Sequence, residues 1–142
     1  MKRLSLLTLV ALLQIAGYSS AQQAVPSKGV TPKLKIEEVI SGYLTDLNGK
    51  YKLSVTEVTF EPGGFVGEHH HVGPHILFVL SGELTSVLNG KTTVYKAGEY
   101  FYEPGNVTHA AFNKTSSPLA VISFDILPAE WKGRTVLPLK SQ

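Results

Sequence analysis

Residues 63–82 read GGFVGEHHHVGPHILFVLSG, and this stretch decides both the fold and the site of the chain. Three of its histidines, His69, His71 and His75, lie close to a Gly-Pro turn. A second stretch, residues 98–113, reads GEYFYEPGNVTHAAFN and adds His109. The chain has no cysteine, and all five of its histidines belong to these two segments, the four named and His70. Neutral imidazole nitrogens suit borderline divalent metals, and the sequence therefore predicts a metal site.

Strand periodicity indicates which histidines share that site. Side chains alternate between the two faces of an extended segment, so His69 and His71 project to one side and His70 to the other. The run from His75 to Leu80 is too short for a typical helix and is bounded by glycines, which favours a core strand. We therefore predict that His69, His71, His75 and His109 point inward, and that His70 does not.

The remaining pattern is that of an all-β protein. Turn signals recur along the chain, and Asn89-Gly90 between two β-rich runs is typical of a hairpin with a type I′ turn. Pro62-Gly63-Gly64 predicts a turn after the strand-like residues 51–60. Many short strands without a convincing helix indicate a sandwich or a barrel. We expect a core that includes Phe65, Leu77, Phe78, Phe112 and Phe124.

The N-terminus has the features of an export signal. Lys2 and Arg3 precede an apolar run from Leu4 to Gly17, and Ala21 suits a signal peptidase site. A membrane anchor is the alternative, but the run is shorter than the roughly 20 apolar residues of a spanning helix. We expect residues 1–21 to be cleaved, and the mature protein to be periplasmic or secreted.

The net charge argues against two classes of partner. The chain has 13 Lys and Arg against 11 Asp and Glu, and Lys2 and Arg3 leave with the signal, so the mature chain is close to neutral. We therefore expect no binding to nucleic acid, nor to a membrane after signal cleavage. The length of 142 residues favours one domain, divided into a flexible N-terminal lead or edge segment at 22–33, a barrel at 34–128 and a tail at 129–142.

The spacing of the two stretches resembles the two motifs of the cupin superfamily. Gly63, His69, His71, His75 and Gly82 have the spacing of the first motif, and Gly98, Pro104, His109 and Asn113 that of the second. The resemblance extends from about Tyr51 to Leu127. It implies a small, single-domain jelly-roll barrel of the cupin type 2 class, with a metal open to substrate at the mouth of the barrel, and a homodimer.

Two positions depart from the pattern of the family. Asn106 replaces a glycine, and asparagine tolerates the left-handed backbone region better than most residues. His75 replaces the usual glutamate and thus exchanges an anionic oxygen for a neutral nitrogen. We expect His75 to be the fourth metal ligand, and the alternative is a supporting or core histidine. Four imidazoles favour iron, nickel, copper or zinc over manganese.

The resemblance leads to two functional hypotheses. The first is a metalloenzyme, an oxygenase or a lyase, that acts on a small anionic molecule. The second is a non-catalytic module that binds or senses a small molecule, which the lack of the motif's carboxylate favours. A structural or storage role has less support. Tyr100, Tyr102 and Glu103 are weak catalytic candidates ahead of His109, with barrel filling as the alternative for the aromatic residues.

Overall fold

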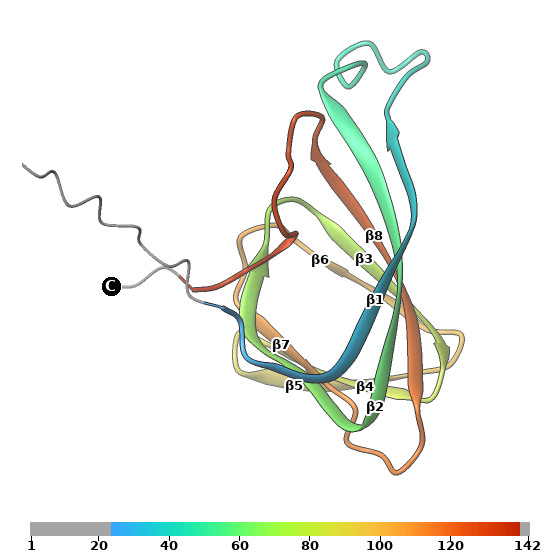
Figure 1. Ribbon diagram of the computed structural model, residues 1–142, viewed down its shortest axis with the longest axis vertical. Helices are drawn as coiled ribbons and strands as arrows, with labels where there is room; N and C mark the ends of the chain where they lie inside the picture. Colours follow the sequence, from blue (N-terminus) through green and yellow to red (C-terminus); the bar gives the residue numbers. More distant parts are fainter. Residues whose placement is uncertain (1–23, 140–142) are drawn as a thin grey trace, which may run out of the picture.

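The computed structural model describes residues 24–139, which form an antiparallel sheet rolled into a jelly-roll barrel (Figure 1). These residues contain no helix, and hence none able to span a membrane. The expected signal at 1–21 lies outside the described residues. The strands are β1 (Ser27–Val39), β2 (Tyr51–His71), β3 (His75–Ser81), β4 (Glu83–Leu88), β5 (Lys91–Lys96), β6 (Tyr100–Glu103), β7 (His109–Phe112), β8 (Leu119–Pro128) and β9 (Val136–Leu137).

Strand β2 connects the whole sheet. The order of the strands is β5-β4-β7-β2-β8-β3-β6, and β1 and β9 also pair with β2. β2 is long enough to pair with β8 in its first half and with β7 in its second half. The predicted turn at Pro62-Gly63-Gly64 is therefore wrong, because the chain continues as a strand through these residues to His71.

The segments at the two ends of the domain are more ordered than the sequence indicates. Residues Ser27–Lys33, predicted as a flexible lead or an edge segment, belong to β1, which pairs along β2. β1 thus continues across residue 34, the predicted start of the barrel. In the predicted tail, β9 pairs with His70 and His71 at the end of β2. Both segments gain backbone hydrogen bonds from the exceptional length of β2.

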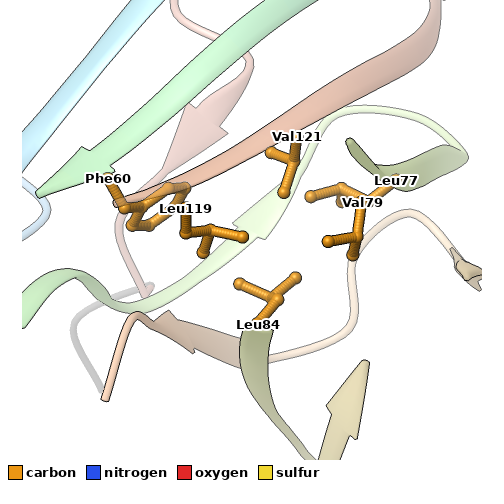
Figure 2. Packing of buried hydrophobic residues seen from close by; sticks show 6 residues of the cluster. All are labelled: Phe60, Leu77, Val79, Leu84, Leu119 and Val121. Atoms are coloured by element: carbon orange, nitrogen blue, oxygen red, sulfur yellow. The ribbon is translucent and has the colours of Figure 1, made fainter. Parts of the chain in front are cut away.

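The hydrophobic core occupies the interior between β2, β3, β4 and β8 (Figure 2). Its buried side chains are Phe60, Leu77, Val79, Leu84, Leu119 and Val121. Leu77 is thus in the core as predicted, whereas the other residues that we expected there are only half-buried. Burial of apolar side chains of this size contributes about 1.5–3 kcal/mol each, so this cluster is a main source of stability for a chain without disulfides.

Two turns fix the positions of the histidine-bearing strands. An added Cβ on Gly73, in the turn between β2 and β3, would overlap the carbonyl oxygen of Ile126. Gly105 lies against the backbone of Gly73, and the amide of Asn106 donates to the carbonyl of His71 at 3.0 Å. Asn106 has a φ of 63°, the left-handed conformation that asparagine tolerates. The loops of the two motifs therefore pack directly against each other.

Candidate metal centre

The four predicted histidines lie together in the interior of the barrel. His69 and His71 end β2, His75 begins β3 and His109 begins β7, and all four are buried. Their ring centroids are 4.1 Å apart for His69 and His109, and 4.0 Å apart for the stacked pair His71 and His75. His70 pairs with Leu137 of β9 and is only half-buried. Side chains alternate between the two faces of β2, so His70 faces away from His69 and His71.

Hydrogen bonds at Nδ1 fix the tautomer of three rings. The Nδ1–H of His69 donates to the carbonyl of Gly67 at 2.7 Å, and that of His109 to the carbonyl of Val107 at 2.9 Å. The Nδ1–H of His75 donates to Asp125 Oδ1 at 2.8 Å. Each ring therefore presents Nε2 as its free lone pair, which is the arrangement in which proteins hold metal-binding histidines.

The donor atoms form two overlapping groups among the described residues. Nitrogens of His69, His71 and His109 lie within 4.8 Å of one another, and a second group joins His71, His75 and Asp125. Such clusters of buried nitrogens fit a divalent metal ion. His71 is common to both groups, so the fourth histidine lies beside the first group and not inside it.

Burial keeps these imidazoles neutral. It lowers the pKa of His69 to about 4, with a further contribution from repulsion by His109. Burial also lowers the pKa of His71 and of His109, and repulsion by His75 adds to the effect at His71. A neutral imidazole is the form that binds a metal, so the site is ready to bind near neutral pH.

Two buried carboxylates accompany the histidines, contrary to the expectation of a site without one. Glu103 and Asp125 are each 2% exposed. Asp125 was missed by the sequence analysis, and it accepts from His75 through Oδ1 and from Ser123 Oγ through Oδ2 at 3.1 Å. Its place in β8, where Val121, Ser123, Asp125 and Leu127 alternate as the buried face, is the signal that would have identified it.

Among the three weak candidates of the sequence, only Glu103 belongs to the site. Its Oε2 lies 3.0 Å from Nε2 of His109 and has no hydrogen-bond donor within residues 24–139. Burial raises the pKa of Glu103 to about 7, with His75 opposing the shift. Tyr100 and Tyr102 are 73% and 59% exposed, so they are neither site residues nor barrel filling. Alternation along β6 places them on the outer face.

A cavity of about 460 Å³ adjoins the site. Its walls are largely apolar, with Val58, Phe60, Leu77, Phe101, Ala111 and Val121 among the lining residues. The four site histidines and Glu103 line it too, and Arg134 and Thr135 contribute from the segment before β9. A volume of this size is in the range of pockets that hold small molecules, about 300–1,000 Å³.

Comparison with known proteins agrees with this architecture. The profile of the family described as "Cupin domain" matches residues 56–125, and no curated protein sequence matches the chain. The polyketide cyclase RemF from Streptomyces resistomycificus has a TM-score of 0.59 at 22% identity, over 80% of this chain and 75% of its own.

Two smaller proteins have the same fold. A cupin domain from Bordetella pertussis has a TM-score of 0.54 at 21% identity, over 72% of this chain and 98% of its own. KdgF from Halomonas sp. has a TM-score of 0.54 at 19% identity, over 70% of this chain and 84% of its own. With both motifs, the matching profile and the jelly-roll barrel in agreement, this chain belongs to the cupin superfamily.

Proposed function

We propose that the protein is an exported metalloenzyme, an oxygenase or a lyase, that acts on a small anionic molecule. A divalent ion of iron, nickel, copper, zinc or manganese is held by His69, His71 and His109, with His75 as the fourth imidazole. The observation that carries the proposal is that three buried imidazole rings donate hydrogen bonds from Nδ1–H to protein acceptors. Their Nε2 lone pairs are therefore available to a cation. When bound, the metal supplies Lewis acidity toward a substrate oxygen.

The cavity supports an open, substrate-binding site in preference to a structural one. Structural metal sites are closed by their protein ligands, whereas catalytic sites keep a position for substrate. Here a cavity of about 460 Å³ shares the buried histidines with the metal site. Arg134 lines the same cavity and adds a positive charge to that of the metal, so an anionic group on an otherwise apolar molecule is the chemistry that it suits.

A non-catalytic binding or sensing module is the second candidate. The apolar character of the cavity favours it, because few groups besides the metal site are available for chemistry. Both oxygens of Asp125 are already engaged, by His75 and Ser123. Stabilisation of the metal-loaded protein by a small carboxylate, without any turnover, would be the result expected of this candidate.

The decisive experiment compares metal-loaded wild type with His69→Ala on a panel of small carboxylates and enolisable acids, with and without dioxygen. The proposal expects turnover that requires both the metal and His69. Consumption of dioxygen assigns the oxygenase reaction, and turnover without dioxygen assigns the lyase reaction. No metal-dependent turnover on any substrate, together with ligand-induced stabilisation, would contradict the enzyme and favour the binding module.

Export and dimerisation complete the proposal. Cleavage after Ala21 predicts a mature protein that begins at Gln22, which intact mass measurement on the exported fraction would establish. A homodimer is supported by the apolar side chains of β1, since Leu34, Ile36 and Val39 are 58%, 47% and 53% exposed. We propose that β1 packs against a second copy of the chain.

A further inference from the structure

We propose that Glu103 is an anionic ligand of the same metal, supplied by β6 in place of the glutamate that the first motif lacks. The inference rests on the metal site proposed above. It adds to the histidines a residue that is none of the positions matched to either motif. Its consequence is a change in the charge of the centre, and so in the metals that the site prefers.

The register of the sheet places Glu103 opposite His75, the residue at which the chain departs from the first motif. β3 and β6 are antiparallel, and His75 pairs directly with Glu103. Directly opposed residues of neighbouring strands have Cβ atoms about 4.5–5.5 Å apart on the same face. Phe101 and Glu103 face the cavity, whereas Tyr100 and Tyr102 face outward. A carboxylate at residue 103 therefore reaches the space that a glutamate at residue 75 would occupy.

The distances around Oε2 of Glu103 are those of atoms that share an ion. They are 3.0 Å to Nε2 of His109, 3.9 Å to Nε2 of His71 and 4.0 Å to Nε2 of His75. Two ligand atoms that are each about 2.1 Å from one ion are about 3.0 Å apart at a right angle and at most about 4.2 Å apart. All three distances lie in this interval.

The hydrogen bonds leave Oε2 without a proton donor. The Nδ1–H groups of His109 and His75 donate to Val107 and Asp125, so the Nε2 atoms of both rings are acceptors. The carboxylate oxygen Oε2 of Glu103 is also an acceptor. Among the described residues no donor reaches Oε2 of Glu103. Facing acceptors in a buried site need a shared proton or a cation between them, because an uncompensated buried carboxylate is strongly destabilising, and a metal ion can satisfy all of these acceptors at once.

Asp125 does not compete for this role. Both of its oxygens accept hydrogen bonds, from His75 Nδ1 and from Ser123 Oγ, and its Oδ1 is 3.7 Å from Nδ1 of His71. It orients His75, which is the usual task of a carboxylate behind a metal-binding histidine. Glu103 is thus the carboxylate that is free to bind the ion, and it lowers the charge of a dication centre to a net single positive charge.

The test measures binding of Co²⁺ and Mn²⁺ to metal-free protein by competition with a chelator, together with the visible spectrum of bound Co²⁺. The variants are Glu103→Gln and, as the control, Glu38→Gln, which alters an exposed glutamate of β1. We expect Glu103→Gln to weaken Co²⁺ binding by more than about 100-fold, beyond the 10–100-fold loss caused by removal of a supporting neighbour. The Co²⁺ spectrum should change, and Mn²⁺ should lose more affinity than Co²⁺ because it prefers carboxylate. Glu38→Gln should behave as wild type.

Other results would overturn the assignment. A loss below about 100-fold with an unchanged Co²⁺ spectrum would make Glu103 a neighbour of the site and not a ligand. If Glu103→Gln does not fold, the infrared difference spectrum of wild type labelled with ¹³C-glutamate decides, since the assignment requires a metal-dependent shift of a glutamate carboxylate band. Failure of the wild type itself to bind metal would overturn the metal site as well. The wild type therefore tests the metal site, and Glu103→Gln tests the role of Glu103.

Discussion

At the scale of single residues, the site depends on hydrogen bonds that orient imidazoles before any ligand arrives. Carbonyl oxygens of Gly67 and Val107 and the carboxylate of Asp125 each hold one Nδ1–H. The first two acceptors lie two residues before the histidine that they orient, so a local backbone conformation fixes the tautomer. Such preorganisation lowers the ordering that metal binding would otherwise require.

Replacement of His69 by alanine should remove most of the metal affinity. We expect His69→Ala to weaken Zn²⁺ binding by more than about 100-fold, since loss of a ligand exceeds the 10–100-fold effect of a supporting residue. His70→Ala is the matched control, because this histidine is adjacent in sequence but faces the other side of β2 and is only half-buried. Chelator competition measures both, and equal losses in the two variants would contradict the assignment of His69.

Replacement of Asp125 tests the orientation of His75. Asp125→Asn keeps the shape of the side chain but removes the charge that accepts from His75 Nδ1 at 2.8 Å. We expect Zn²⁺ affinity to fall by about 10–100-fold. The control is Asp46→Asn on the exposed loop before β2. Wild-type affinity in Asp125→Asn, measured by the same competition assay, would show that His75 needs no carboxylate partner.

Acidification should destabilise the metal-free protein. The pKa of His69 is lowered to about 4 and those of His71 and His109 are also lowered, so these rings stay neutral in the fold while the unfolded chain takes up protons below about 6.5. The unfolded state then binds more protons, and stability falls as the pH falls from 7 toward 4. Glu103 acts in the opposite direction, because its pKa of about 7 in the fold lies above its ordinary value.

Three histidines outweigh one glutamate, so the net effect is a loss of stability. The urea midpoint of metal-free protein should decrease between pH 7.5 and pH 5, and it should decrease more steeply in Glu103→Gln, which lacks the opposing titration. A midpoint that rises over this interval in the wild type would contradict the lowered histidine pKa values.

At the scale of elements, strands present site residues by simple alternation, and the sequence predicts this part well. The Asn89-Gly90 turn is confirmed by φ values of 49° and 77°, both in the left-handed region. The inward placement of the site histidines also agrees with the structure. The same rule applied to residues 100–103 would have separated Glu103 from the two tyrosines. Asp125 lay outside both motifs, and its place on the alternating buried face of β8, where it pairs with His75 of β3, is what identifies it.

The turn between β2 and β3 offers a test at this scale. Gly73→Ala would place a Cβ on the carbonyl oxygen of Ile126 and push the turn away from β8. We expect a loss of about 1–3 kcal/mol in the free energy of unfolding and a weaker metal affinity, because His71 and His75 flank this turn. Urea denaturation and chelator competition measure the two effects.

Gly98→Ala provides the comparison for that variant. Gly98 has a φ of 88° but open space around its Cβ, so alanine there costs about 1–2 kcal/mol of backbone strain. It lies far along the chain from the β2–β3 turn and should leave the metal affinity unchanged. Unchanged metal affinity in Gly73→Ala would mean that the packing of this turn does not position the histidines.

At the scale of the whole molecule, the features that the sequence could not predict are long-range pairings. β1 has a mixed composition and mostly exposed side chains, so its local pattern indicates only a flexible lead or an edge segment at its start. Its pairing depends on β2 continuing through Gly63 and Gly64, residues that locally favour a turn. β9 is two residues long and pairs only because it meets the end of β2. Such partners cannot be recognised from a local window.

The exposed apolar side chains of β1 predict the oligomeric state. We expect wild-type protein to be a homodimer and the double variant Leu34→Lys with Ile36→Lys to be a monomer, because charge on an apolar interface disfavours association. Metal affinity should not change. Light scattering after size exclusion measures the mass, with Val94→Lys on β5, 46% exposed, as the control. A monomeric wild type, or a dimeric double variant, would contradict this role of β1.

The central claim is that the four buried histidines bind a metal ion in the native protein. Elemental analysis of mature, untagged protein from the exported fraction tests it most directly, with His69→Ala purified in parallel. We predict close to one equivalent of iron, nickel, copper, zinc or manganese in the wild type and a large loss in the variant. Wild-type protein that contains no metal, and takes up none when it is supplied, would contradict the claim.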